Sequence, residues 1–284
     1  MSAPATAKVA AAALKIVPRR SGDRGHAHHR GFLRTYHTFS FAGYQDRAFE
    51  SWGALRVINE DRVEKGEGFG RHNHANFEIF SFIVDGELEH KDSMGNTEIM
   101  VRGDVQMTSA GTGIAHSEYN RNTEKEVHFL QIWALPNKQG LKPQYTTRHF
   151  TDEQKRDKLC KVVAPSKSNG VSEAREAKGP APVHAALTMF ASILSPKATL
   201  SHTLSPTTQK AYLHSIMRSG YRAPQTAASD KFEDGGAMLQ VNGGLIMEEG
   251  DGAFVTVQGK EGERELTFKN VGERDVEFLL FEME

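Results

Sequence analysis

The chain has 284 residues, with 36 acidic and 35 basic side chains and a formal net charge of −1. This balance excludes a strongly basic surface for direct binding of nucleic acid or of an anionic membrane. No apolar run is long enough to span a bilayer. The single cysteine, Cys160, excludes an intramolecular disulfide and indicates a reducing compartment, so we expect a cytoplasmic or nuclear protein. The length favours two domains.

Residues 1–30 are expected to form a flexible N-terminal tail. The first 20 residues are rich in alanine and contain four basic side chains but no acidic one. That composition also fits a mitochondrial transit peptide, an interpretation that we rank below the tail because termini of small residues are usually mobile.

Short runs of alternating or β-branched residues recur from residue 35 onward, separated by Gly, Asp and Asn. Runs at this spacing, with no long helical pattern, predict an all-β sandwich or barrel. The same texture returns in the second half, where Gly250-Asp251 stands at a place comparable to Gly103-Asp104 in the first. We therefore expect an internal duplication. The predicted parts are an N-terminal domain at 31–150, a linker at 151–182 and a C-terminal domain at 183–284.

The segment between Gly66 and Asn120 contains two groups of metal-ligand side chains. Alternate side chains of a strand share a face, so His72, His74 and Glu78 can point one way, as can His116 and Glu118 on a second strand. Three neutral imidazoles and one carboxylate suit a borderline divalent ion such as Fe, Ni, Cu or Zn. The sequence therefore predicts a metal site inside a small β-barrel.

These motifs resemble those of the cupins and, more narrowly, of the pirin family. The first cupin motif is similar to Gly66, His72, His74 and Glu78, and the second to Gly103, Gly111, His116 and Asn120. The pirin resemblance covers most of residues 35–136 and lies in segments 37–41, 56–61, 68–72, 90–96, 109–116 and 130–133. Two departures are that Gly86 comes one residue late and that Ser109 stands where the second motif usually has proline.

The resemblance implies two tandem cupin (jelly-roll-like) β-barrels with one metal ion, in the N-terminal barrel only. The implied ligands are His72, His74, His116 and Glu118. The ion implied is Fe(II), with Ni, Mn, Cu or Zn as alternatives. The C-terminal cupin of the family lacks ligands, and here it contains no His-x-His.

Two functions follow from the resemblance. The first is a quercetin 2,3-dioxygenase that opens a ring of a flavonol substrate. The second is a non-enzymatic, iron-binding redox sensor that acts as a nuclear co-regulator through a transcription-factor partner. In either case we expect a monomer. An enzyme needs an apolar pocket over the metal, whereas a sensor needs only electron access and an interaction patch.

The role of Glu78 stays open, because Glu78 and Glu118 both have the parity of a ligand. In pirins the second motif supplies the carboxylate, so we expect Glu118 to bind the metal and Glu78 to support it or to act as a general base. Both glutamates are the candidate catalytic residues. Phe80 and Phe82 share this parity and could line the cavity, whereas His90 and His128 are expected to be ordinary barrel residues.

Overall fold

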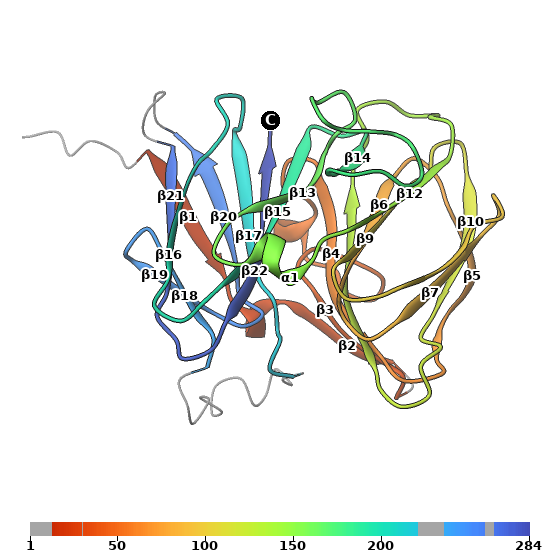
Figure 1. The fold of residues 1–284 in the computed structure, drawn as a ribbon, viewed down its shortest axis with the longest axis horizontal. Coiled ribbons are helices and arrows are strands. Elements are labelled where there is room, and N and C mark those ends of the chain that lie inside the picture. The colour runs from red at the N-terminus through yellow and green to blue at the C-terminus, as the bar shows by residue number, and fades with distance from the viewer. Residues whose placement is uncertain (1–12, 30, 221–235, 259–263) are drawn as a thin grey trace, which may run out of the picture.

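The computed structural model describes residues 13–29, 31–220, 236–258 and 264–284. Its regular elements are almost all strands, which form two sheets of seven strands and two of four. The sheets make two barrels that lie side by side, with their larger sheets facing each other (Figure 1). The prediction of an all-β fold is confirmed. Within these ranges no helix has the length and apolar character needed to cross a membrane.

The N-terminal barrel joins a seven-stranded sheet, in the order β12-β9-β6-β11-β4-β3-β2, to a four-stranded sheet, in the order β5-β10-β7-β8. Every pairing within it is antiparallel. Its strands are β2 (Gly25–His29), β3 (Leu33–His37), β4 (Leu55–Val63), β5 (Gly68–His74), β6 (Glu78–Asp85), β7 (Leu88–Asp92), β8 (Thr97–Met100), β9 (Asp104–Ser109), β10 (Ile114–Tyr119), β11 (Val127–Ala134) and β12 (Gln144–His149).

The C-terminal barrel repeats this plan, with sheets in the orders β1-β20-β17-β22-β15-β13-β14 and β16-β21-β18-β19. Its strands are β1 (Leu14–Arg19), β13 (Cys160–Pro165), β14 (Ala181–Val183), β15 (Leu187–Leu194), β16 (Thr199–Thr203), β17 (Lys210–Ser215), β18 (Met238–Val241), β19 (Leu245–Glu248), β20 (Gly252–Val257), β21 (Glu265–Asn270) and β22 (Val276–Met283). The described helices are the one-turn α1 (Asp152–Lys155) and the 3₁₀ turns η1 (Ser21–Asp23) and η2 (Arg47–Phe49).

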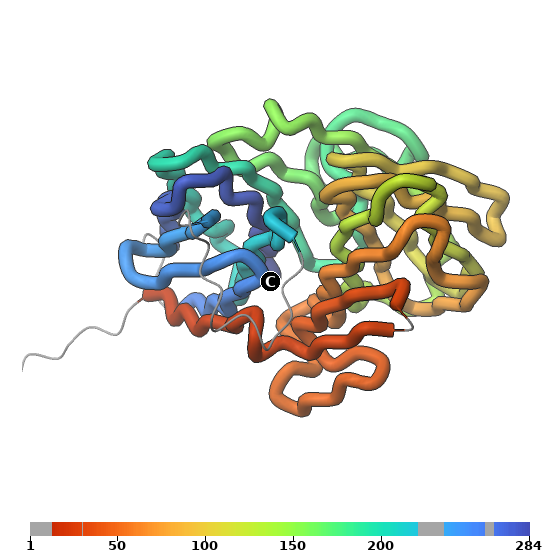
Figure 2. Tube along the Cα trace, turned by 90° about the horizontal axis from the view of Figure 1, so that it is seen from below, coloured from red at the N-terminus to blue at the C-terminus, as the bar shows by residue number. Residues whose placement is uncertain are grey.

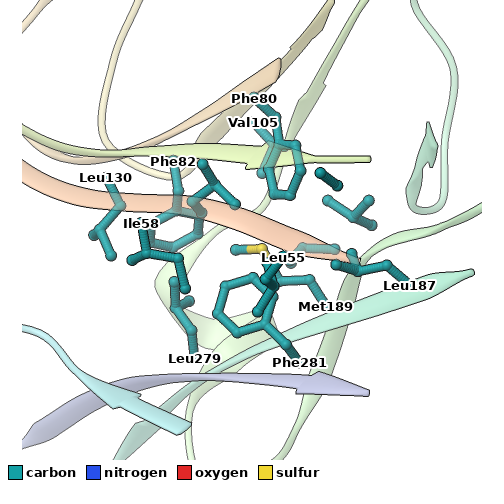
Figure 3. Close-up of a cluster of buried hydrophobic side chains, with 14 of the residues drawn as sticks. Leu55, Ile58, Phe80, Phe82, Val105, Leu130, Leu187, Met189, Leu279 and Phe281 are labelled. Atoms are coloured by element: carbon teal, nitrogen blue, oxygen red, sulfur yellow. The ribbon is translucent and has the colours of Figure 1, made fainter. Parts of the chain in front are cut away.

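The two large sheets pack through one hydrophobic core. Ile58 and Phe82 of the N-terminal barrel lie in the same buried cluster as Met189, Leu279 and Phe281 of the C-terminal barrel (Figure 3). Consequently β4, β6 and β11 are covered on both faces, by the barrel interior on one side and by the second barrel on the other. On strands that are buried on both faces, the alternation of polar and apolar residues no longer reveals the inner face. In β4 the four consecutive residues 59–62 are all polar and all buried.

A buried carboxylate ties the barrels together within this interface. The Glu60 side chain of β4 accepts a hydrogen bond from the backbone N–H of Met217 at 2.7 Å and lies 3.0 Å from the Nε2 atoms of both His128 and His214. Burial by itself would raise the pKa of Glu60, but these imidazole hydrogen bonds hold it well below its usual range. His128 is therefore an interface residue rather than part of a metal site.

The predicted N-terminal tail is wrong for the part that the structure describes. β1 pairs with β20 from Leu14↔Val257 to Arg19↔Gly252, and β2 pairs with β3. Leu14 and Ile16 pack on the core of the C-terminal barrel, which gives this segment an apolar face that a tail would lack. The red segment in Figure 2 runs from one barrel to the other. Residues 1–12 lie outside the described residues.

The predicted linker at 151–182 is too long. β13 pairs with β15 in the large sheet of the C-terminal barrel, and its Val162 and Val163 are fully buried in the core between the barrels. The second barrel therefore takes strands from before residue 183. Only residues 166–180, between β13 and β14, form the polar loop that the composition indicates.

Candidate metal centre

Two adjacent strands bring three predicted ligands together. β5 and β10 are antiparallel neighbours in the small sheet, with His116 opposite His72, and His74 two residues further along β5. The centroids of the three imidazole rings lie 4.5–4.8 Å apart. The Nε2 atoms of His72 and His116 are 3.0 Å apart. Two nitrogens that bind one ion at about 2.1 Å and at a right angle would be separated by about the same distance.

The protonation states of these histidines suit metal binding. The Nδ1 of His72 lies 2.8 Å from the carbonyl oxygen of Gly70, to which it donates when neutral, so that Nε2 is left as the free ligand atom. Burial, reinforced by the neighbouring imidazoles, lowers the pKa of His74 to about 4 and that of His116 to about 3. At neutral pH the imidazoles of His74 and His116 are therefore uncharged and can act as ligands.

Glu118 is buried beside the histidines and is held by two side chains from the opposite sheet. Its Oε2 accepts a hydrogen bond from Gln131 Nε2 at 2.9 Å, and its Oε1 accepts one from Ser81 Oγ at 3.4 Å. The pairing of β10 with β5 shifts register between His116 and Glu118. The hydrogen bonds from Gln131 and Ser81 fix the direction of the Glu118 carboxylate, which keeps acceptor capacity for an ion.

His90 belongs to this cluster, although sequence analysis assigns it an ordinary barrel role. It lies opposite Glu118 in the pairing of β7 with β10, and its side chain is fully buried. Ligand atoms of His90, His116 and Glu118 lie within 4.8 Å of one another, as do those of His72, His74 and His116. His116 is thus common to both groups of ligand atoms. The sequence signal for a role of His90 in the cluster was its alternation with Asp92 on a strand that pairs with β10.

Glu78 lies apart from the cluster, so the expectation that it shares a face with the ligands is wrong. Its Oε2 accepts hydrogen bonds from Ser109 Oγ at 2.8 Å and from the backbone N–H of His184 at 2.9 Å, on the side of β6 that faces the second barrel. The turn between β5 and β6, with Asn76 at φ 54°, resets the alternation of the chain. Residue parity therefore cannot be carried from β5 into β6.

The expectation that Phe80 and Phe82 line the cavity is wrong for the same reason. Both are fully buried in the core between the barrels and do not line the cavity at the histidines. Their neighbour Ser81, whose hydroxyl reaches Glu118, occupies the inner face of β6 instead.

A largely apolar cavity of about 450 Å³ lies beside His72, His74 and Glu118. Its aromatic walls are Phe32, Phe41, Phe69 and Trp133, and its polar lining includes Asn59, Asp61 and Gln131. Sequence analysis does not assign these residues to the site. Asn59 and Asp61 of β4 alternate with the polar residues Glu60 and Arg62, which bond to the second barrel, so no local pattern singles out the cavity side.

The donor set fits a divalent transition metal ion. Neutral imidazoles with a carboxylate match Fe, Ni, Cu or Zn better than Mg or Ca, which prefer oxygen ligands alone. The buried Nδ1 of His90 has no hydrogen-bond partner among the described residues. Unsatisfied nitrogens of this kind are costly unless a ligand or water completes them.

Comparison with known proteins identifies similar chains. The family model "Pirin" matches residues 20–134. A pirin-like protein of Caulobacter vibrioides is 33% identical over 247 residues, which cover 87% of this chain and 96% of that protein. The crystal structure of the bacterial pirin YhhW from Escherichia coli in complex with nickel(II) is 30% identical, with a TM-score of 0.76 and coverage of 95% of this chain and 99% of that one. This match confirms the bicupin architecture.

A relative named for its activity matches over a shorter stretch. "Quercetin 2,3-dioxygenase" of Escherichia coli strain K12 is 49% identical over 135 residues. The aligned region covers 48% of this chain and 58% of that relative. The chain therefore matches less than two thirds of the length of that relative.

Proposed function

Because this chain belongs to the pirin family, we propose that it is a metal-dependent oxygenase of the quercetin 2,3-dioxygenase type. The observation that carries the proposal is the apolar, aromatic-walled cavity that reaches the histidine cluster. A redox sensor would need no such cavity, whereas an enzyme for a flat aromatic substrate would. The names of the relatives support the flavonol as the substrate class.

We propose His72, His74, His116 and Glu118 as the residues that hold the ion, with iron as the family's implied metal. When bound, such an ion supplies Lewis-acid activation of a substrate hydroxyl and a redox route to dioxygen. Gln131 and Ser81 keep Glu118 directed toward the cluster through their hydrogen bonds. Glu118 also lines the cavity, so its carboxylate is the group placed to receive the proton of the flavonol 3-hydroxyl.

The cavity walls would orient the substrate. Trp133 lies edge-on to His74 with ring centroids 4.8 Å apart, and edge-on to Phe41 at 5.4 Å. These rings present flat apolar surfaces to a planar aromatic compound and exclude water from the reacting end. Glu78, which hydrogen-bonds away from the cavity, has no part in this proposal.

The direct test is oxygen uptake with quercetin under air, with protein reconstituted separately with Fe(II), Ni(II), Mn(II) or Cu(II). His74→Ala and Glu118→Ala remove two proposed ligands, and His149→Ala is the matched control because His149 is exposed and hydrogen-bonds Asp104 instead. We expect uptake that depends on the metal, disappears in both ligand variants and persists in the control.

Tight metal binding without oxygen uptake for every ion would refute the enzymatic proposal for this substrate. The same variants then serve to test metal-dependent binding of a protein partner.

A further inference from the structure

A second chamber of about 360 Å³ adjoins the cavity at the histidine cluster. The two spaces are adjacent, because five residues line both of them: Phe32, Phe41, Asn59, Asp61 and Phe69. The far chamber adds Leu33, Thr35 and His37, from β3, to its walls. It contains none of the proposed metal ligands. A substrate held at the cluster could therefore extend into it.

The far chamber has mostly apolar walls but contains buried polar groups. His37 Nδ1 and Asn59 Oδ1 satisfy each other at 2.8 Å. The Oδ1 atom of Asp61 and the Oγ1 atom of Thr35 are buried and have no partner at full hydrogen-bond geometry among the described residues. The Thr35 hydroxyl nevertheless lies close enough to Asp61 to lower the pKa of its carboxyl. Both residues are at most 4% exposed. Leaving such groups unpaired costs free energy, which a bound ligand would recover.

Thr35 and Asp61 lie directly opposite each other in the pairing of β3 with β4. One offers a hydroxyl donor and the other a carboxyl acceptor, at one place in an aromatic-walled space. A hydroxyl group both donates and accepts, so it can satisfy the two side chains together. Leu33 and Phe69 supply apolar contacts for a ring that carries this hydroxyl.

We propose that the far chamber is a subsite for a phenolic ring, whose hydroxyl hydrogen-bonds Asp61 and Thr35 while the other end of the compound reaches the histidine cluster. This inference rests on the proposed function, since it specifies the substrate class as an extended flavonol with a hydroxyl remote from its metal-binding oxygens. Asp61 is then a residue that determines specificity.

The test measures binding to the metal-loaded protein under argon, where no oxygen is present to consume the ligand. The probes are 3-hydroxyflavone, 3,7-dihydroxyflavone and 3,4′-dihydroxyflavone, which differ only in a remote hydroxyl. Quenching of tryptophan fluorescence reports binding because Trp133 lines the cavity, and isothermal calorimetry confirms each Kd. We expect one dihydroxy compound to bind about tenfold more tightly than 3-hydroxyflavone, as one well-placed hydrogen bond provides.

Substitutions of Asp61 and Thr35 test whether these residues cause the tighter binding of the dihydroxy compound. Asp61→Leu and Thr35→Val should each reduce the preference for that dihydroxy compound over 3-hydroxyflavone to less than threefold. Asp61→Asn, which keeps an amide acceptor, should retain part of it. Asp85→Leu is the matched control, because Asp85 is exposed at the end of β6 and pairs with Lys125. If Asp61→Leu does not fold, Thr35→Val and Asp61→Asn decide the question.

Equal affinity of wild-type protein for all three probes would overturn the subsite, even if quercetin were consumed. A preference that survives both Asp61→Leu and Thr35→Val would also overturn it. Conversely, a preference that these variants abolish supports the subsite even when no compound is oxidised, in which case only the oxygenase proposal fails.

Discussion

The two barrels share a framework of hydrogen bonds around one asparagine each. They differ at two positions just before that asparagine, where one barrel has polar side chains and the other has apolar ones. Asn120 directly follows β10 and Asn270 is the last residue of β21, the equivalent strand of the other small sheet, and each makes the same three hydrogen bonds. The side-chain nitrogens donate to the carbonyls of Val63 and Lys125 in one barrel and of Leu194 and Arg274 in the other. Each side-chain oxygen accepts the backbone N–H two residues further on. The two asparagines therefore show which residues of one barrel correspond to which residues of the other.

The alignment shows what replaces the metal ligands. Four and two residues before the asparagine, the N-terminal barrel has His116 and Glu118, and the C-terminal barrel has Leu266 and Phe268. Both of the latter are fully buried in an apolar core. One barrel therefore uses its interior for packing, and the other keeps buried polar groups and a cavity there. The turns at Gly103-Asp104 and Gly250-Asp251 also match, because each aspartate carboxylate accepts the N–H three residues earlier.

The largest effect is expected from Phe268→Ala, which would empty the packed barrel. Truncation of a fully buried phenylalanine typically lowers the free energy of unfolding by about 3–5 kcal/mol. Metal content should not change, since Phe268 lies in the other barrel. Urea denaturation and metal analysis of the same samples measure both quantities. A parallel loss of metal would show that the barrels are not independent in this respect.

The next test removes the ligand common to both groups of the N-terminal barrel. His116→Ala should lower the affinity for Ni(II) or Zn(II) by roughly 100-fold or more, because even residues that only support ligands contribute 10- to 100-fold. Competition with a metal chelator measures the affinity. His202→Ala is the matched control, because His202 stands opposite Leu266 as His72 stands opposite His116. Equal losses in the two variants would contradict the assignment.

The third prediction concerns pH. Burial, with the nearby carboxylates Glu118 and Glu60 adding to it, raises the pKa of Asp61 to about 7. The native state then binds a proton that the unfolded chain has lost, so the free energy of unfolding falls as pH rises between about 4 and 7. Asp61→Asn should remove roughly 2 kcal/mol of the decline between pH 5 and 7. Denaturation of both proteins at the two pH values measures it, and identical slopes would contradict it.

The last prediction tests the shared framework of asparagine hydrogen bonds. Asn120→Ala and Asn270→Ala should each lower the free energy of unfolding by about 1 kcal/mol per hydrogen bond that is not replaced by water. Because the contacts are equivalent, the two losses should agree within experimental error when measured by urea denaturation. A much larger loss in one barrel would mean that the asparagines are not equivalent.

The sequence by itself determined the fold class, the family and the cluster of His72, His74 and His116. Strand periodicity is a local property, and the two histidine motifs lie on neighbouring strands whose side chains meet at short range. The same local reasoning could not place Glu78, Phe80 and Phe82, because the turn at Asn76 resets the alternation.

Only the tertiary structure decided which face of β4, β6 and β11 is internal, since the second barrel buries the other face as fully as the first barrel's interior buries its own. For the same reason Asp61 and Gln131 could not be assigned to the cavity from their strands alone. β1 likewise gains its role through β20, more than 200 residues away, a pairing that no local pattern specifies. Burial on both faces removes the polar alternation from which an inner face is predicted, so only the long-range packing distinguishes the cavity from the interface.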